Sequence, residues 1–218
     1  MEKDYLKTRF EPEEFEKLKK KLVRYECALD VVRTQLSNLN TYYNNFEAIN
    51  PIEHIKHRLK SPESIAGKLK KKDLPVTADA ADEHLSDIAG IRIICSYAKN
   101  IYEIVEIIKS QEAFTVVSEK DYLRNVKKTG YRSYHMIIEI PVFFSKGKTP
   151  MRVELQIRTN GMDFWATLEH QLRYKKGIEE LPGYEDISEE LYRSAQAVIE
   201  MDNEMQQIKN KIGMFHDI

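Results

Sequence analysis

Apolar residues near the two ends of the chain recur at alternating spacings of three and four residues, with Glu and Lys in most of the positions between them. This pattern predicts a long helix at each end, each with one apolar seam. The seam residues are Phe15, Leu18, Leu22, Tyr25, Leu29, Val32, Leu36, Leu39 and Tyr43 in the first helix, and Ile187, Leu191, Ser194, Val198, Met201, Met205, Ile208, Ile212 and Phe215 in the second. A seam must be covered within the subunit or by another subunit, and the pattern leaves both arrangements open.

Strand and helix patterns alternate between these helices, over roughly residues 50–176. We expect strands at 53–60, 90–97, 114–122, 134–144 and 151–159, the last two joined as an antiparallel hairpin by "SKGKTP". We expect helices at 61–72, capped by Ser61, at 100–111 and at 161–175, and a loop at 177–186. In the last helix, Trp165 with Phe164 and Leu168 is expected to pack against the sheet.

The predicted fold class is therefore α/β, a mixed β-sheet core flanked by helices. The domain boundaries expected from the same patterns are an N-terminal helical extension at 1–49, a central domain at 50–176 and a C-terminal helical extension at 177–218.

Composition narrows the class of protein. Of 218 residues, 32% are charged and 42% hydrophobic, and the net charge is −1, so no global charge draws the chain to nucleic acid. No apolar run approaches the roughly 20 residues that span a bilayer, and the N-terminus lacks the apolar stretch of a signal peptide. Cys27 and Cys95 lie too far apart in sequence to suggest a metal pair or a disulfide framework. We expect a cytoplasmic protein without a membrane partner.

Basic residues gather in the segment 52–72, which holds seven Lys or Arg and two Glu. Ser64 and Lys68 are four residues apart on one helix face, and Lys71 follows one turn later. Arg58 and Lys60 lead directly into the start of that helix, where unpaired N–H groups also attract anions. The segment is either a polyphosphate cradle or a solvated basic face.

Acidic and polar residues mark two strands. In 151–159, Glu154, Gln156 and Arg158 alternate with apolar residues, so they share one face of the strand, either as an exposed ion-paired face or as a ligand floor. Asp87 precedes the strand at 90–97, where Ala89 and Gly90 leave room for close approach. Acids at adjoining strand ends commonly hold Mg²⁺ against phosphates.

The segment "TGYRSYH" at 129–135 places aromatic rings beside cations after a glycine. It is either a turn entering a strand or a loop that approaches a flat, anionic ligand.

These motifs together resemble the synthetase domain of the RelA/SpoT family over roughly residues 50–176. The resemblance rests on "RLKSPESIAGKLKKK", "DIAGIRIIC", "KDYLRNVKKTGYRSYH" and "VELQIRTNGMDFWATLEHQLRYK". The terminal helices are similar to those of the small alarmone synthetases, the RelP type more than the RelQ type.

The resemblance implies a nucleotidyltransferase-like fold and Mg²⁺-dependent transfer of pyrophosphate from ATP to the 3′-hydroxyl of GDP or GTP, which makes the alarmones ppGpp and pppGpp. It also implies a homotetramer formed through the terminal helices. By position, Asp87 and Glu154 would hold Mg²⁺, and Glu154 would accept the proton of the attacking hydroxyl. The residues expected to bind ATP are Arg58, Lys60, Ser64, Lys68, Lys71 and Arg92; those expected at the acceptor nucleotide are Lys127, Tyr131, His135, Gln156, Lys120 and Asp163.

The sequence also departs from the family pattern in places. Val126 and Thr129 stand where many relatives have Pro and Asn, Tyr134 where Leu is usual, Asp163 where RelQ-type enzymes often have Asn, and Lys120 where some relatives have Arg. Two other functions fit the residues: a different nucleotidyltransferase of the same fold, and an RNA-binding module built on 52–72 and the Tyr/Arg loop. RNA binding is the less expected of the two, because the net charge gives no drive toward it.

Overall fold

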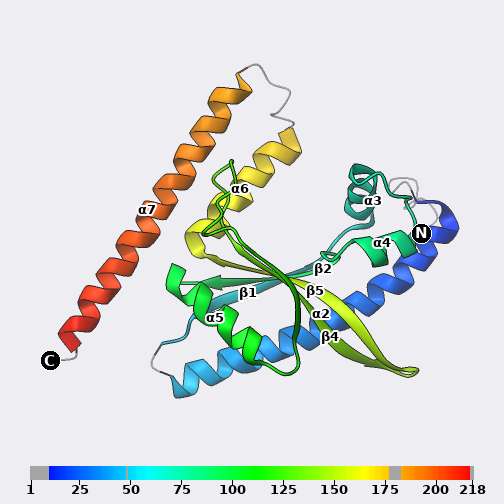
Figure 1. Cartoon of the computed structure of the whole chain (residues 1–218), viewed down its shortest axis with the longest axis horizontal. Coiled ribbons are helices and arrows are strands. Elements are labelled where there is room, and N and C mark those ends of the chain that lie inside the picture. The colour runs from blue at the N-terminus through cyan, green and yellow to red at the C-terminus, as the bar shows by residue number, and fades with distance from the viewer. Residues whose placement is uncertain (1–9, 48, 177–182, 217–218) are drawn as a thin grey trace.

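The structure is a computed structural model that describes residues 10–47, 49–176 and 183–216. In chain order the elements are α2 (Pro12–Phe46), β1 (Ile52–Leu59), α3 (Pro62–Lys71), α4 (Ala78–His84), β2 (Ala89–Cys95), α5 (Ala98–Ser110), β3 (Thr115–Asp121), β4 (Tyr134–Phe144), β5 (Gly147–Thr159), α6 (Asn160–Lys176) and α7 (Tyr184–His216). Figure 1 shows the sheet at the centre, with α2 crossing it and the α6–α7 pair beyond one edge. The expected α/β class is confirmed.

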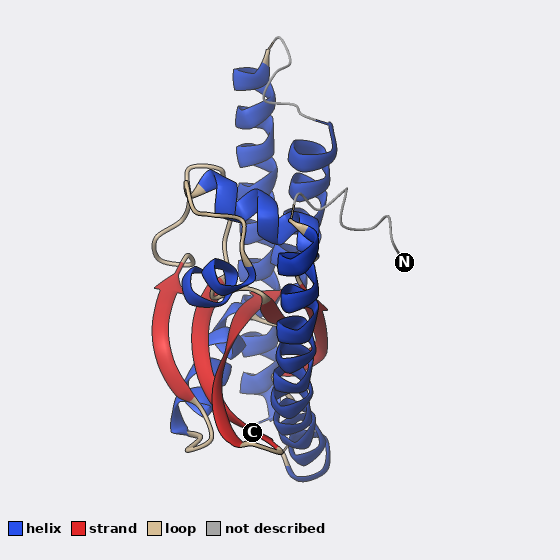
Figure 2. Cartoon of the chain, turned by 90° about the vertical axis from the view of Figure 1, so that its right-hand side faces the viewer, coloured by secondary structure: helices blue, strands red, loops and turns tan. Residues whose placement is uncertain are grey.

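The five strands form one mixed sheet in the order β1-β2-β5-β4-β3, and all neighbours are antiparallel except β2 and β5. The hairpin of β4 and β5 is confirmed, although its turn is tighter than expected, because pairing continues to Phe144 and Gly147. Figure 2 shows the curved, twisted strands side by side, with α2 running along them.

The hydrophobic core lies on one face of the sheet. Val153, Leu155 and Ile157 of β5 are fully buried, in one cluster with residues of α2 and α5. Because side chains alternate along a strand, Glu154 and Gln156 lie on the opposite face. That second face is therefore the polar face of the sheet.

The first apolar seam packs within the subunit. Phe15, Leu18, Tyr25, Leu29, Val32 and Leu36 are all buried in the core. The second seam is covered only in part. Its first half packs against α6, with Leu191 and Val198 beside Trp165, whereas Met201, Met205, Ile208 and Ile212 are each about half exposed. Phe215 lies where no side chain is described.

Trp165 is buried, but the expectation that it packs α6 against the sheet with Phe164 and Leu168 is wrong. Trp165 faces α7, where its Nε1 donates to the carbonyl of Leu191 and to Ser194 Oγ, at 3.2 and 2.9 Å. Phe164 and Leu168 are 65% and 43% exposed. The one polar residue of this seam, Ser194, thus has a role, because its hydroxyl accepts the hydrogen bond of the Trp165 indole.

Two short regions differ from the expected elements. α4 was not expected, because its seven Ala-, Asp- and Glu-rich residues show no apolar stripe; Thr77 caps it by accepting from the N–H of Ala80. The predicted loop 177–186 lies outside the described residues at 177–182, and its last three residues, 184–186, belong to α7 instead. Within the described ranges, no helix has the length and apolar character required to cross a membrane.

Candidate active site

Four adjoining cavities line the polar face of the sheet and together form one cleft. Their volumes are about 200, 590, 350 and 750 Å³, and they share lining residues such as Arg58, Glu154 and Lys127. Every site residue predicted from the sequence, with one exception, lines at least one of them. The exception is Asp163. Side chains from three helices and five strands thus reach one surface.

The two predicted acids, Asp87 and Glu154, line the same cavity of about 350 Å³. The parallel pairing of β2 with β5 brings them together, since Glu154 is the register partner of Gly90, three residues after Asp87. Asp87 Oδ2 accepts from Lys60 and Lys68, each at 2.6 Å. Burial raises the pKa of Asp87, but these two lysines outweigh burial and hold the pKa below its ordinary value.

Glu154 is almost enclosed, with 13% of its side chain exposed. His135 Nδ1 lies 3.2 Å from Oε1, and Gln156 Nε2 donates to Oε2 at 2.8 Å. Burial raises the pKa of Glu154, and the hydrogen bonds of His135 and Gln156 more than offset it, whereas the nearby charge of Asp87 opposes ionisation. The net pKa lies below its ordinary value, so Glu154 is a carboxylate at neutral pH and can accept a proton.

A chain of hydrogen bonds runs from Glu154 to the loop at 129–135. His135 Nε2 lies 2.8 Å from the hydroxyl of Tyr131, and Arg158 donates to the same hydroxyl at 2.5 Å. An ionised carboxylate can only accept, so a neutral His135 carries its proton on Nδ1 and accepts from Tyr131 through Nε2. The acid and the tyrosine are thus held in one network.

The basic side of the cleft is the cavity of about 750 Å³ at the start of α3. Its lining includes Arg58, Lys60, Ser64, Lys68 and Lys71, the five residues proposed from the sequence as a phosphate cradle. Ser61 Oγ accepts from the N–H of Ser64 at 3.3 Å, as expected of an N-cap. Cations and a helix start therefore face one cavity, which favours the cradle over a purely solvated face.

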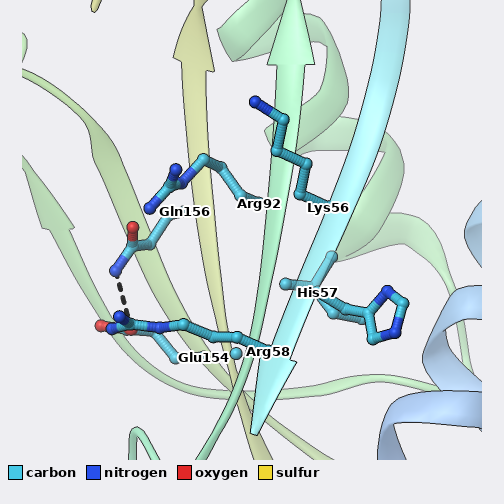
Figure 3. A pocket seen from close by; sticks show the side chains of 8 residues that line it. Lys56, His57, Arg58, Arg92, Glu154 and Gln156 are labelled. Carbon is cyan, nitrogen blue, oxygen red and sulfur yellow. Dashed lines mark hydrogen bonds between the residues drawn. The ribbon is translucent and has the colours of Figure 1, made fainter. Parts of the chain in front are cut away.

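Between this basic cavity and β5, Arg58 and Arg92 reach across the sheet. Figure 3 shows both side chains extending toward Glu154 and Gln156, while His57 points to the other side of β1. A Cβ on Gly90 would lie 3.8 Å from Arg58 Cγ, so the arginine stem passes close over the glycine backbone.

The other end of the cleft surrounds Tyr131. Lys127 Nζ and Arg158 Cζ lie 4.7 and 5.1 Å from the centre of its ring, and the ring of Tyr122 meets it edge-on at 6.0 Å. Lys127 and Lys120 both line the cavity of about 350 Å³ that holds the two acids, and burial, together with the nearby charge of Lys120, lowers the pKa of Lys127.

The loop before Tyr131 rests on α7. Gly130 has φ of +86°, and a Cβ there would lie 2.6 Å from the Cβ of Ala195. Glycine is thus required both for the backbone conformation and for the contact with α7.

Two residues without an assigned role also belong to the cleft. Arg158 is buried and joins Tyr131, Gln156 and Ser133 through hydrogen bonds. His170 lines two of the cavities. The signal for His170 was present in the helical spacing, because Asp163, Ala166, Thr167 and His170 share one face of α6.

A divalent cation fits the acidic pair. Asp87 Oδ1 is buried and has no hydrogen-bond partner within the described part of the chain. Among residues 10–47, 49–176 and 183–216, no group of three or more Asp, Glu, His or Cys side chains is placed to hold a metal ion, so the protein would supply at most two carboxylates as ligands here. Mg²⁺ commonly takes one or two carboxylates and completes its shell with substrate phosphates and water, which matches two acids beside a basic cavity.

Comparisons with known proteins identify relatives of this chain. Residues 57–179 match a family model described as a region found in RelA/SpoT proteins. The chain is 41% identical over 194 residues to the GTP pyrophosphokinase YwaC of Bacillus subtilis (strain 168), covering 89% of this chain and 91% of that protein. It is 35% identical over 191 residues to the GTP pyrophosphokinase YjbM of the same organism, covering 88% of each.

Solved structures show the same fold. The crystal structure of the small alarmone synthetase 1 from Bacillus subtilis bound to its product pppGpp superposes with a TM-score of 0.83 at 34% identity, covering 89% of this chain and 97% of that one. The crystal structure of the small alarmone synthetase 2 from the same organism gives a TM-score of 0.79 at 41% identity, covering 88% and 98%.

Proposed function

This chain belongs to the RelA/SpoT family and is a GTP pyrophosphokinase, and we propose that its cleft transfers pyrophosphate from ATP to the 3′-hydroxyl of GDP or GTP. The observation that carries the proposal is the convergence of Asp87 and Glu154 in one cavity, between a basic cavity on one side and an aromatic one on the other. Phosphoryl transfer depends mainly on positioning and charge neutralisation, and this cleft provides groups for both.

ATP occupies the basic side in this proposal. Its phosphates lie against Lys60, Ser64, Lys68 and Lys71, and its adenine lies against Arg92, with Arg58 between the base and the phosphates. Two observations support this placement. The four residues assigned to the phosphates line one cavity, and Arg58 lines that cavity and two adjoining ones. Lys60 and Lys68 now pair with Asp87, and a triphosphate would give them a second anionic partner.

The acceptor nucleotide occupies the aromatic side. Its guanine stacks on Tyr131, and Lys127, Lys120, His135 and Gln156 hold its sugar and phosphates. Lys127 lies over the rings of Tyr122 and Tyr131 at 4.5 and 4.7 Å, so stacking of a base requires Lys127 to leave that position for the phosphates. Its lowered pKa reflects burial and the neighbouring Lys120, and an acceptor phosphate would relieve this repulsion.

The proposed reaction needs one base. Glu154 takes the proton of the 3′-hydroxyl as the oxygen bonds to the β-phosphorus of ATP, and the bond from that phosphorus to the α-phosphate oxygen breaks, releasing AMP. Asp87 and Glu154 would hold Mg²⁺, which supplies charge neutralisation at the transferred phosphates when bound. Gln156 and His135 keep the Glu154 carboxylate oriented through the hydrogen bonds at 2.8 and 3.2 Å.

Assembly is proposed to use α7. The seam of α2 is buried inside the subunit, whereas Met201, Met205, Ile208 and Ile212 leave about half of each side chain exposed along one face of α7. We propose that this face supports a homotetramer, in which α7 rather than α2 supplies the contact. Sedimentation of the wild-type protein beside a Met205→Glu variant tests this, and a monomeric wild type would exclude it.

The product assay tests the function directly. The protein is incubated with Mg²⁺, ATP and GDP, and nucleotides are separated by ion exchange. AMP and a guanosine tetraphosphate in equal amounts support the proposal. Release of free pyrophosphate would instead indicate a nucleotidyltransferase acting on another acceptor, and RNA binding that persists in Glu154→Gln without nucleotide turnover would indicate an RNA-binding module.

A further inference from the structure

Asp163 is the one predicted site residue that lines none of the four cavities. It lies in the first turn of α6 and is 8% exposed at its side chain. Its carboxylate is surrounded by cations from three adjacent strands. Oδ1 accepts from Arg92 of β2 at 2.8 Å and from Arg158 of β5 at 3.4 Å, and Oδ2 accepts from Lys56 of β1 at 3.1 Å.

Both oxygens of Asp163 are therefore engaged, which leaves little capacity for a direct bond to a nucleotide. The cations also differ in their surroundings. Arg158 is 5% exposed and Arg92 26%, so loss of the carboxylate would leave a buried positive charge without its anion. Lys56 is 56% exposed and can be compensated by water.

The two arginines are assigned to different substrates. Arg92, the proposed adenine contact, lines the cavity of about 200 Å³ beside Arg58, and together with Arg158 it also lines the cavity of about 590 Å³ around Tyr131. Arg158 donates to the hydroxyl of Tyr131 at 2.5 Å and to Gln156 Oε1 at 2.7 Å, beneath the acceptor cavity. One carboxylate oxygen thus holds a contact of the ATP site and a contact of the guanine-nucleotide site.

We propose that Asp163 is a positioning residue that couples the two substrate sites by fixing Arg92 and Arg158 relative to each other. The inference rests on the proposed function for the identity of the ligands. A nucleotide that orders one arginine also orders the carboxylate, so the second nucleotide meets a partner already in place. Such coupling is reciprocal: ATP strengthens GDP binding by the same factor as GDP strengthens ATP binding.

The acid is needed rather than its amide. A carboxylate offers two acceptor oxygens, whereas an asparagine offers one and turns an NH₂ group toward a cation. Asp163→Asn keeps the size and shape of the side chain, and its amide oxygen can still accept from Arg92 and Arg158, but the negative charge that balances the two guanidinium groups is lost and the NH₂ group faces Lys56.

The experiment is titration calorimetry on the full chain. A non-hydrolysable ATP analogue and GDP are each titrated alone and then in the presence of the other, with the wild type, Asp163→Asn and the control Asp30→Asn. Asp30 makes the same chemical change possible on the solvent face of α2, where its carboxylate is 63% exposed and pairs with Arg33 at 2.9 Å. Melting temperatures are measured for all three.

In the wild type each nucleotide should strengthen binding of the other about fivefold or more. In Asp163→Asn both should bind about tenfold more weakly, the scale of one charge-assisted hydrogen bond, and the coupling factor should fall to about one. Asp30→Asn should match the wild type.

Three results would overturn the proposal. Weaker GDP binding with unchanged ATP-analogue binding would make Asp163 a direct acceptor contact. A lowered melting temperature with the coupling factor intact would make its role structural. Independent binding of the two nucleotides to the wild type would overturn coupling without any variant. None of these depends on turnover, so failure of the proposed reaction is detected separately by the product assay.

Discussion

Replacement of Gly130 by alanine tests whether α7 holds the acceptor loop in place, that is, the loop at 129–135 that carries Tyr131. The residue has φ of +86°, which costs an L-amino acid roughly 1–2 kcal/mol. The added methyl would also lie 2.6 Å from Ala195 Cβ and 3.4 Å from a ring carbon of Tyr192. Overpacking of a tight contact costs about 1–3 kcal/mol more, so the loop conformation loses about 2–5 kcal/mol.

This loss falls on the acceptor loop, because Gly130 directly precedes Tyr131. Steady-state kinetics should show the KM for GDP raised at least about twentyfold in Gly130→Ala, since the competent loop is populated correspondingly less. The KM for ATP should change far less, because Arg58, Lys60 and Lys68 lie on other elements. Gly183→Ala is the matched control: its φ is +82°, yet among the described residues nothing lies within 4 Å of the added methyl.

The second variant separates the two costs. Ala195→Gly removes the methyl that the new side chain meets, so Gly130→Ala/Ala195→Gly should recover about tenfold of the lost GDP affinity and retain only the backbone strain. Ala195→Gly alone controls for the lower helix propensity of glycine. A GDP KM unchanged by Gly130→Ala, or a double variant no better than the single one, would refute the dependence of the loop on α7.

Three further predictions concern the carboxylates and the stacking ring. Glu154→Gln should lower kcat at least about a hundredfold in the product assay while both nucleotides still bind in calorimetry; retained turnover would remove Glu154 as the base. Tyr131→Ala should raise the KM for GDP about tenfold or more through lost stacking, with a smaller effect on ATP, whereas Tyr131→Phe keeps the ring, loses only the hydroxyl bonds to Arg158 and His135, and should raise this KM less than Tyr131→Ala does; equal losses for both nucleotides would contradict stacking. The pKa values of Glu154 and Asp87 in the folded protein lie below the ordinary 4.5 and 3.8. The two carboxylates therefore stabilise the fold at pH values above 4.5, and this stabilisation is lost as the pH falls through their folded pKa values. Melting temperatures between about pH 7 and pH 3 should therefore fall in this acid window, and less steeply in Glu154→Gln.

The sequence was sufficient for those features that repeat with a period. The strand at 151–159 and its two faces follow from alternation, and the core seam of α2 follows from helical spacing. α4 has no such pattern, since its short run of alanines packs without an amphipathic stripe. The sequence did indicate which residues could meet a nucleotide, because Lys, Arg and aromatic residues gather in short segments.

The position of Asp163 could not be predicted in the same way. Its partners Lys56, Arg92 and Arg158 come from three strands, and they become neighbours only once the order β1-β2-β5 is known. Likewise, Gly130 meets Ala195 across 65 residues of sequence, and no local signal marks the contact. Contacts between distant segments are properties of the topology, and neither strand alternation nor helical spacing determines the strand order.

One pairing in the sheet determines both the core and the cleft. Glu154 is in register with Gly90, and Leu155 with Ile91, in the parallel pair of β2 and β5. Because successive side chains point to opposite faces, a slip of one residue in β5 would turn Glu154 and Gln156 into the core and expose Val153, Leu155 and Ile157, all of which are fully buried. The hydrophobic cost of that slip holds the register. The same apolar residues that stabilise the sheet therefore keep Glu154 beside Asp87, although none of them touches a nucleotide.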